Sequence, residues 1–171
     1  MEVTGIDKAV QAQMYKFACI SLCSNTVGQL AVGLMVNPPA PETAAGKQYI
    51  GERDAILGSM KRRVEKLTGV LNSMEGVNCQ PIEGAMYAFP QIVLPPKACA
   101  AAEATGQLPD SFYCMEALEA TGIVMVPGNG FRQVEGTHHF RTTFLPPEEQ
   151  MDEVVERLGD WHKKFMDQHR E

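Results

Sequence analysis

The chain has 171 residues, which suits one compact domain or two small ones and excludes a large multidomain enzyme. Hydrophobic residues make up 44% and charged residues 21%, so disordered, collagen-like and coiled-coil classes fit poorly. Lys and Arg number 15 against 21 Asp and Glu, a net charge of −6, and the basic residues are interspersed with acids. Nucleic acid and anionic membranes are therefore not expected as partners.

Targeting and redox signals are weak. No run of 18 apolar residues occurs, and the first ten residues carry acids, so neither a membrane span nor a secretory signal is predicted. We expect a cytoplasmic chain. The five cysteines form no C-x-x-C pair, which predicts reduced thiols and no metal site. Cys19 and Cys23 are interpreted as small buried hydrophobes.

Two helices are predicted at the start of the chain. Apolar residues recur at helical spacing over residues 7–23, and Asp7 can cap that helix. A second helix is predicted to begin near Asn25, which can cap it. It must end before the sequence Asn37-Pro38-Pro39, because proline cannot continue the hydrogen-bond ladder.

A long helix is predicted next. Residues 40–47 read as an exposed loop, and a stripe of apolar residues at steps of three and four then predicts a helix over 48–74. Its length is typical of a helix that bridges two subdomains, and Gly76 can end it in the left-handed conformation.

Short strands follow this helix. Residues 77–80 and 85–92 are predicted to pair around a turn at 81–84, and Pro90 should make the later part an edge or an ending. The remaining elements are a polar, alanine-rich insertion at 94–107, a helix at 111–121, strands at 123–126 and 140–145, and a final helix at 148–169. Asp110 is the predicted cap of the first of these helices, and Gly122 its terminator.

The predicted fold class is α+β: a short-stranded sheet with helices, preceded by two helices and a long connector helix. The first two helices each have an apolar side but no sheet of their own, as expected for the tail end of a larger domain. We therefore expect residues 1–47 to be that remnant, 48–76 the connector, and 77–171 a small α+β domain.

Three stretches could carry chemistry. In VPGNGF, residues 126–131, two glycines and Asn129 permit a tight turn with positive φ, and taken alone an ordinary turn is favoured. In EGAMYAF, residues 83–89, a Gly-Ala pair allows close approach and Tyr87 offers a phenol, although a strand bend with core aromatics is again favoured.

The third stretch is HHFRTTF, residues 138–144, where Arg141 lies in an otherwise apolar, β-branched and aromatic strand. A buried arginine needs an anionic partner, and its planar fork suits a carboxylate. That carboxylate could be a structural Asp or Glu, which the residues alone favour, or a substrate. His138 and His139 point to opposite faces of a strand, so a shared metal is not expected.

Five segments in chain order resemble the C-terminal part of the alanine aminotransferases, pyridoxal-phosphate enzymes of the aspartate aminotransferase fold. The segments are SNTVGQLAVGLMVNPP, ERDAILGSMKRR, EGAMYAFP, VPGNGF and HFRTTFLPP. The resemblance covers essentially the whole chain. It implies that residues 1–47 end the large cofactor-binding domain and that residues 77–171 form the small domain.

The resemblance also implies site residues. Arg141 would pair bidentately with the α-carboxylate of an amino acid or keto acid, with a turn and a phenol beside the substrate. The substrate-binding residues so implied are Arg141, Gly128, Asn129, Gly130 and Tyr87, and the residues near the cofactor pocket are Ser24 and Asn25. The implied reaction is amino transfer from L-alanine to 2-oxoglutarate, giving pyruvate and glutamate, in a homodimer.

Transamination also needs a lysine that holds the cofactor as a Schiff base. None of the eight lysines follows a strand with small hydroxyl residues, so no catalytic residue is expected in this chain. We expect a fragment that begins past the cofactor site and does not bind pyridoxal phosphate alone. Two alternatives stay open: a non-catalytic amino-acid or keto-acid binding module or dimer partner, and a mitochondrial parent instead of a cytoplasmic one.

Overall fold

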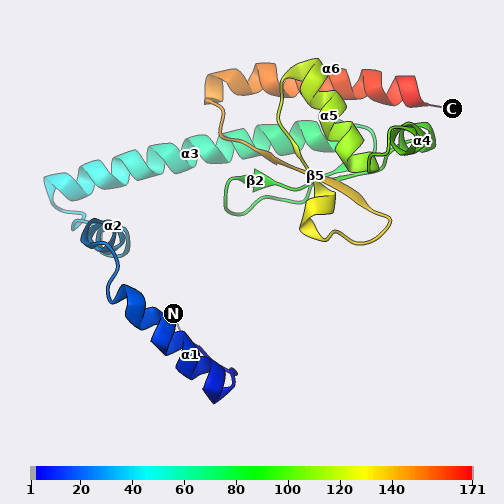
Figure 1. The fold of residues 1–171 in the computed structure, drawn as a ribbon. Coiled ribbons are helices and arrows are strands. Elements are labelled where there is room, and N and C mark those ends of the chain that lie inside the picture. Colours follow the sequence, from blue (N-terminus) through cyan, green and yellow to red (C-terminus); the bar gives the residue numbers. More distant parts are fainter. Residues whose placement is uncertain (1–2, 171) are drawn as a thin grey trace. The chain divides into compact units, whose positions relative to one another are not determined.

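The computed structural model describes residues 3–170. The chain divides into two compact units, Met1–Asp54 and Ala55–Glu171, which we call the N-terminal unit and the C-terminal unit. The N-terminal unit contains α1 (Lys8–Ala18), the 3-10 turn η1 (Cys19–Ser21), α2 (Thr26–Val36) and the beginning of α3 (Ala44–Ser73). Figure 1 shows these elements in chain order.

Side-chain caps start the first helices where the sequence predicts. The Asp7 carboxylate accepts the N–H of Ala9 at 2.8 Å, and the Asn25 amide oxygen accepts the N–H of Gly28 at 3.1 Å. The predicted loop at 40–47 is wrong in its second half, because α3 begins at Ala44. Thr43 explains the early start, since its hydroxyl accepts the N–H of Gly46 at 3.0 Å and so caps the first turn.

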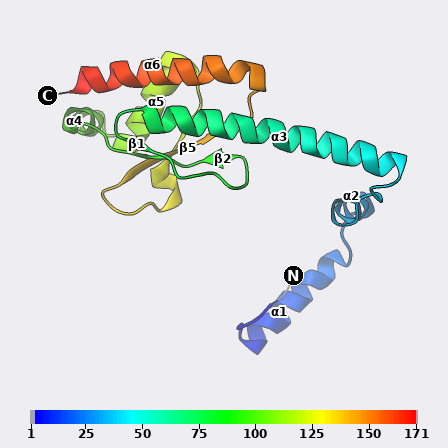
Figure 2. The same ribbon diagram turned by 180° about the vertical axis from the view of Figure 1, so that it is seen from behind.

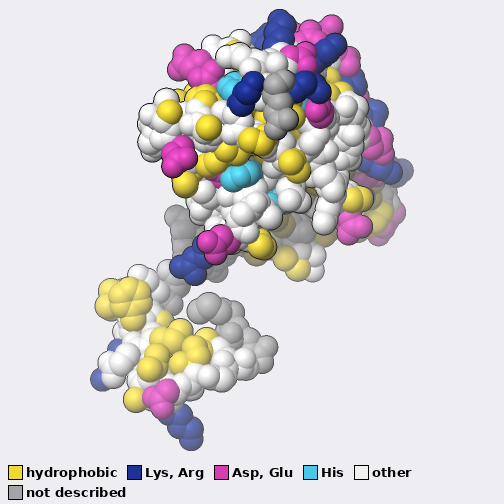
Figure 3. Space-filling model, turned by 90° about the vertical axis from the view of Figure 1, so that its right-hand side faces the viewer, with side chains coloured by type: hydrophobic (Ala, Val, Ile, Leu, Met, Phe, Trp, Pro, Cys, Tyr) yellow, Lys and Arg dark blue, Asp and Glu magenta, His cyan; other side chains and the backbone are white. Residues whose placement is uncertain are grey.

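The first two helices leave their apolar sides uncovered. Neither α1 nor α2 contains a buried residue, and Phe17, Leu22 and Leu30 are 77%, 86% and 69% exposed. Figure 3 shows apolar side chains at this surface. The expectation that Cys19 and Cys23 are buried is wrong; both are exposed, because no sheet within the unit covers them.

Within residues 3–170, no single helix is long and apolar enough to cross a bilayer. The segments Lys8–Ser21 and Thr26–Val36 reach the required length and composition only together, as a pair bent by 110°.

The C-terminal unit contains a five-stranded antiparallel sheet of order β1-β3-β5-β2, with β4 paired to β5. The strands are β1 (Val77–Asn78), β2 (Tyr87–Ala88), β3 (Gln91–Ile92), β4 (Val126–Pro127) and β5 (His138–Thr143). The predicted hairpin is therefore correct only for its outer half, where β1 pairs with β3. The inner half, β2, pairs with β5 instead.

Proline explains why β2 and β3 are separate strands. Tyr87 pairs with Thr143 and Gln91 with His139, so both strands follow one register along β5. Pro90 lies between them and has no N–H to donate, although its carbonyl accepts the N–H of Phe140 at 3.2 Å.

The helices of this unit are α4 (Pro96–Ala104), α5 (Pro109–Thr121) and α6 (Met151–His169), with short 3-10 turns η2 (Gly128–Phe131) and η3 (Glu148–Gln150). The insertion predicted at 94–107 contains α4, because alanine is the best helix former and Pro96 suits a first helical position. Asp110 does not cap α5. The helix begins earlier than predicted, because Pro109 occupies its first helical position. Asp110 therefore lies inside the first turn.

Gly122 is confirmed as the terminator of α5, because it follows the helix directly with φ of 72°, the left-handed conformation that ends a helix without a Cβ clash. Gly76 also has φ of 72°, but α3 ends three residues earlier at Ser73, so Gly76 lies in the turn that leads into β1. The final predicted strand and helix also form, as β5 and α6.

Helices α3, α5 and α6 lie on one side of the sheet in both ribbon views (Figures 1 and 2). The core lies between these helices and the sheet. Its largest fully buried members include Tyr113, Phe140, Phe144, Leu71 and Leu158. Burial of side chains of this size contributes about 1.5–3 kcal/mol each, so this side of the sheet carries the stability of the unit.

Two arginines of α3 hold the segment that follows β5. The Arg63 guanidinium donates to the carbonyls of Phe144, Leu145 and Pro146 at 3.0–3.1 Å. Arg62 forms a bidentate pair with Glu148 at 2.6 and 2.8 Å. Hydrogen bonding from Arg62 lowers the pKa of Glu148 to about 2, so this carboxylate stays ionised at neutral pH.

Candidate functional site

Alternation along β5 separates two faces of the sheet. Phe140 and Thr142 are buried on the side of the helices, while Arg141 between them is half-buried on the opposite side. Tyr87 alternates with the buried Ala88 in the same way, so its ring lies on the side of Arg141. The sheet thus presents arginine and tyrosine together on its outer face.

Two aromatic rings contact the Arg141 guanidinium. Its central carbon lies 4.6 Å from the centroid of the Tyr87 ring and 4.8 Å from that of Phe131 in η2, both distances typical of cation–π contacts. Among residues 3–170, no hydrogen bond or ion pair involves this guanidinium. The structural carboxylate that the residues alone favoured is thus absent from the described part of the chain, and the N–H donors face no protein acceptor there.

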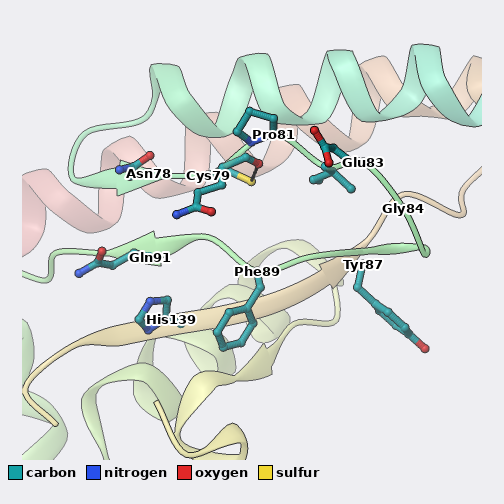
Figure 4. Close-up of a pocket in the computed structure, with 11 residues that line it drawn as sticks. Asn78, Cys79, Pro81, Glu83, Gly84, Tyr87, Phe89, Gln91 and His139 are labelled. Carbon is teal, nitrogen blue, oxygen red and sulfur yellow. Dashed lines mark hydrogen bonds between the residues drawn. The ribbon is translucent and has the colours of Figure 1, made fainter. Parts of the chain in front are cut away.

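Phe89 and His139 extend the same aromatic surface. Their rings stack at 5.0 Å with planes 4° apart, and Phe89 also meets the edge of Phe131 at 5.6 Å. Figure 4 shows Tyr87, Phe89 and His139 on the same side of the strands. We call the surface formed by Tyr87, Phe89, Phe131, His139 and Arg141 the arginine face.

The predicted turn at Gly128-Asn129-Gly130 lies within η2, beside this face. Its glycines do not adopt positive φ as the sequence suggested; the left-handed residue is Arg132, with φ of 54°. Gly128 is needed for space instead, because a Cβ there would lie 2.8 Å from the carbonyl oxygen of His139. Nothing lies within 4 Å of a Cβ built on Gly130.

Asn129 uses its donors within the protein. Its backbone N–H and its side-chain amide donate to the two oxygens of Asp110 at 2.7 and 2.8 Å, and the amide also donates to the Ser111 hydroxyl at 2.7 Å. These three hydrogen bonds therefore hold η2 in place.

Asp110 is the centre of a buried hydrogen-bond network. It is 1% exposed, and its carboxylate accepts four hydrogen bonds, from the Ser111 and Asn129 N–H groups, the Asn129 amide and the Gln133 amide, all at 2.7–2.9 Å. The Gln133 oxygen lies 3.1 Å from Nδ1 of His139. The network joins the start of α5 to η2 and to β5.

This network also assigns the His139 tautomer. Because the Gln133 amide nitrogen donates to Asp110, its oxygen accepts, so Nδ1 of His139 carries the hydrogen. Burial and the neighbouring His138 lower the pKa of His139 below its usual 6.5, which favours the neutral ring at pH 7. Its Nε2 is then an acceptor.

A depression of about 470 Å³ adjoins the arginine face (Figure 4). Amide side chains line it from β1 and β3, together with Glu83 and the rings of Phe89 and His139. Tyr87 lies at its edge, with the phenol directed away from the strands. Polar groups therefore surround the aromatic pair on this side.

Ser24 and Asn25 belong to the N-terminal unit. The Asn25 amide oxygen caps α2, and the Ser24 carbonyl accepts the Gln29 amide at 2.8 Å. Both residues line a hollow together with Gly28 and Gln29 of the same unit. Their predicted place near a cofactor pocket stays a prediction.

Sequence reasoning missed Phe131, Phe89, Gln133 and the inward role of Asp110. Phe89 was within reach, because strand alternation from Tyr87 places it on the same face. The roles of Phe131, Gln133 and Asp110 depend on contacts that only the tertiary fold creates, so no local sequence pattern predicts them.

Comparison with protein-family models found no match. Among curated proteins, the chain is 52% identical over 170 residues to "Probable alanine aminotransferase, mitochondrial" of Dictyostelium discoideum. This alignment covers 99% of the chain and 32% of that protein. The chain is also 46% identical over 169 residues to "Alanine aminotransferase 2" of Xenopus laevis, an alignment that covers 99% of the chain and 31% of that protein. The chain is homologous to the alanine aminotransferases along its whole length.

Solved structures agree with this relationship to the alanine aminotransferases. The alanine aminotransferase from Pyrococcus furiosus superposes with a TM-score of 0.65 at 28% identity, covering 91% of the chain and 34% of that structure. The aspartate aminotransferase from Rhizobium meliloti shares the fold, with a TM-score of 0.58. The chain spans about a third of the length of the relatives it matches, and its fold is that of an aminotransferase C-terminal domain.

Proposed function

We propose that the arginine face binds the α-carboxylate of an amino acid or keto acid. One observation carries the proposal: the Arg141 guanidinium is half-buried over two aromatic rings and has no carboxylate partner among residues 3–170. A cation placed in this way is stabilised by the rings while its hydrogen-bonding fork remains open. A carboxylate can then accept two parallel N–H bonds.

The residues of this chain act on such a substrate by binding and orienting it. The paired bonds to Arg141 fix the plane of the carboxylate, which also fixes the direction of the bond to the α-carbon. The rings of Tyr87 and Phe131, which are 43% and 42% exposed, shield part of the guanidinium from water, and this shielding strengthens the attraction between the charges. The His139 Nε2 acceptor lies on the same face but has no step assigned to it.

In the whole protein we propose that this binding serves transfer of an amino group between L-alanine and 2-oxoglutarate, giving pyruvate and glutamate, in a homodimer. Residues 1–47 would be the end of the large domain and residues 77–171 the small domain. Residues 48–76 would be the helix that connects the two domains. Three of the relatives are named as mitochondrial, which supports a mitochondrial over a cytoplasmic parent.

Pyridoxal phosphate, the cofactor that supplies an electron sink in this family, does not fit the described residues by themselves. A Schiff base needs an amine in a closed site. Lys66 instead pairs with Asp152 at 2.6 Å, Lys97 donates to the Arg170 carbonyl at 3.0 Å, and the other six lysines are exposed. The buried Asp110 carboxylate, which could pair with a ring nitrogen, already accepts four bonds.

Borohydride trapping tests this point. The chain is mixed with pyridoxal phosphate, reduced with borohydride and analysed by mass spectrometry. We expect scattered, substoichiometric labelling of exposed lysines. A stoichiometric adduct on one lysine would show that the chain forms a cofactor site by itself.

A free-standing binding module is the alternative function. Such a module would have to cover the apolar sides of its first helices, but within the N-terminal unit α1 and α2 contain no buried residue. This exposure supports a segment of a larger protein.

The carboxylate site is tested by titrating the chain with pyruvate and with alanine while the Arg141 Nε–Hε resonance is followed by NMR. We expect a saturable shift. Because Arg141→Lys lacks this resonance, its affinity is compared with that of the wild type by isothermal titration calorimetry. The variant should bind about tenfold more weakly, because a point ammonium loses one of the paired bonds. Arg157→Lys on α6 is the matched control and should bind as the wild type does. Equal affinity of Arg141→Lys and the wild type would remove Arg141 from the site.

A further inference from the structure

We propose that Phe131 is a positioning residue for Arg141, and that the buried Asp110 carboxylate determines where Phe131 lies. This inference rests on the proposed function, since it concerns how the carboxylate-binding guanidinium is held. It assigns no chemistry to Phe131, whose ring acts only through Arg141.

Packing, not hydrogen bonding, orients the Arg141 guanidinium. An arginine side chain has four rotatable bonds, and most functional arginines are fixed by acceptors along their length. Arg141 has no such acceptor among residues 3–170, so the two ring faces are its described restraints. Tyr87 comes from a neighbouring strand with fixed register, whereas Phe131 comes from a four-residue 3-10 turn.

Burial in the core does not account for the aromatic ring at Phe131. Its side chain is 42% exposed, so it contributes little to the core. Its defined contacts are the face that meets Arg141 at 4.8 Å and the edge-to-face contact with Phe89 at 5.6 Å. A half-exposed ring with its face on a cation is suited to holding that cation and contributes little else.

Hydrogen bonds from outside the turn fix the position of η2. A turn of four residues does not hold its own position, and here the Asp110 carboxylate accepts both the backbone N–H and the side-chain amide of Asn129. Gly128 lets the turn press against β5, where any Cβ would collide with His139. Asp110 therefore anchors the turn from α5, and Phe131 projects from the end of that turn.

The consequence is a preorganised cation. Because the rings stabilise the charge through their faces, they leave the N–H donors unused. The substrate carboxylate then meets a guanidinium whose rotamer is already selected, so less conformational entropy is lost on binding.

The test uses the full chain with Phe131→Leu, and Phe131→Tyr as the conservative variant. Ring-current displacement of the Arg141 Nε–Hε resonance and its 15N heteronuclear NOE report stacking and order directly, and pyruvate titration gives Kd. We expect Phe131→Leu to lose part of the upfield displacement, to lower the NOE and to weaken pyruvate binding about two- to thirtyfold. Phe131→Tyr should keep the wild-type values of the displacement, the NOE and the Kd.

A control separates positioning from stability. Phe112 packs against Phe165 and His169 of α6, at ring distances of 6.3 and 6.1 Å, so Phe112→Leu should lower the melting temperature and leave the Arg141 signal and Kd unchanged. Asp110→Asn should reproduce the loss of displacement and NOE seen in Phe131→Leu. If Phe131→Leu keeps the wild-type displacement, NOE and Kd, the inference is wrong.

Arg141→Gln distinguishes this failure from failure of the proposed function. Loss of pyruvate binding in Arg141→Gln together with wild-type binding in Phe131→Leu would leave the carboxylate site intact and refute only the positioning role. Wild-type binding in Arg141→Gln would refute both.

Discussion

Replacing Asp110 by asparagine should destabilise the C-terminal unit although it adds or removes almost no volume. The carboxylate is 1% exposed and accepts four hydrogen bonds, two on each oxygen. An amide keeps one acceptor oxygen, so two bonds are lost, and each charge-assisted bond is worth about 1.5 kcal/mol. Relief of the buried charge offsets part of this. The expected loss of unfolding free energy is about 2 kcal/mol.

Urea unfolding followed by circular dichroism measures this loss. The midpoint should fall while the slope with denaturant stays unchanged, because the surface exposed on unfolding is the same. The melting temperature should drop by about 6 °C. Asp160→Asn, an exposed position on α6, is the matched control and should lie within about 0.5 kcal/mol of the wild type. If Asp110→Asn is no less stable than Asp160→Asn, the four bonds do not anchor η2.

Three further outcomes are expected. Gly128→Ala should destabilise more than an ordinary surface Gly→Ala change, because the new Cβ would lie 2.3–2.8 Å from atoms of Gln133 and His139; a wild-type melting curve would show that η2 moves freely. Trp161→Ala should cost about 2 kcal/mol, because this half-buried ring packs on two aromatic neighbours; no change in melting would show that α6 is held without it. Burial lowers the pKa of His162 below 6.5, so the unfolded state binds the proton more readily and stability should fall as pH drops below about 6.5. His162→Gln should reduce this fall between pH 8 and 5.5, and an identical pH dependence in the variant would exclude His162 as its source.

Local signals in the sequence predict most helices and their ends. Asp7, Asn25 and Gly122 act within one turn of their own position, so hydrogen-bond and φ requirements identify them without tertiary knowledge. Thr43 is the exception among the caps. Its hydroxyl role was hidden because the following residues, Ala-Ala-Gly, show no apolar periodicity.

Strand pairing is where local reasoning failed. The sequence shows that residues 85–92 alternate, but not which edge they meet, because a tight turn makes the nearest strand look like the partner. The actual partner of β2 is β5, more than 50 residues later in the chain. Long-range pairing depends on which faces must be buried together, and that information is spread over α3, α5 and α6.

The candidate site was predicted in part for the same reason. Arg141 was identifiable because a charge in an apolar strand conflicts with its surroundings. Asp110 was not, because an acid just before a helix has an ordinary explanation as a cap. In the structure that acid turns inward, and Pro109 is the residue that changes its role, since it takes the first helical position.

Side chains that face the core alternate along β5 with side chains that face outward, because a strand has a period of two. Phe140 and Thr142 face the helices and Arg141 faces outward, so a slip of one residue would bury the guanidinium and expose the phenylalanine. Pro90 interrupts the ladder directly beside this point, which by itself weakens the register. Pairs on both sides of the interruption, Tyr87 with Thr143 and Gln91 with His139, hold the same alignment. The core packing that fixes these pairs is therefore also what keeps Arg141 on the outer face.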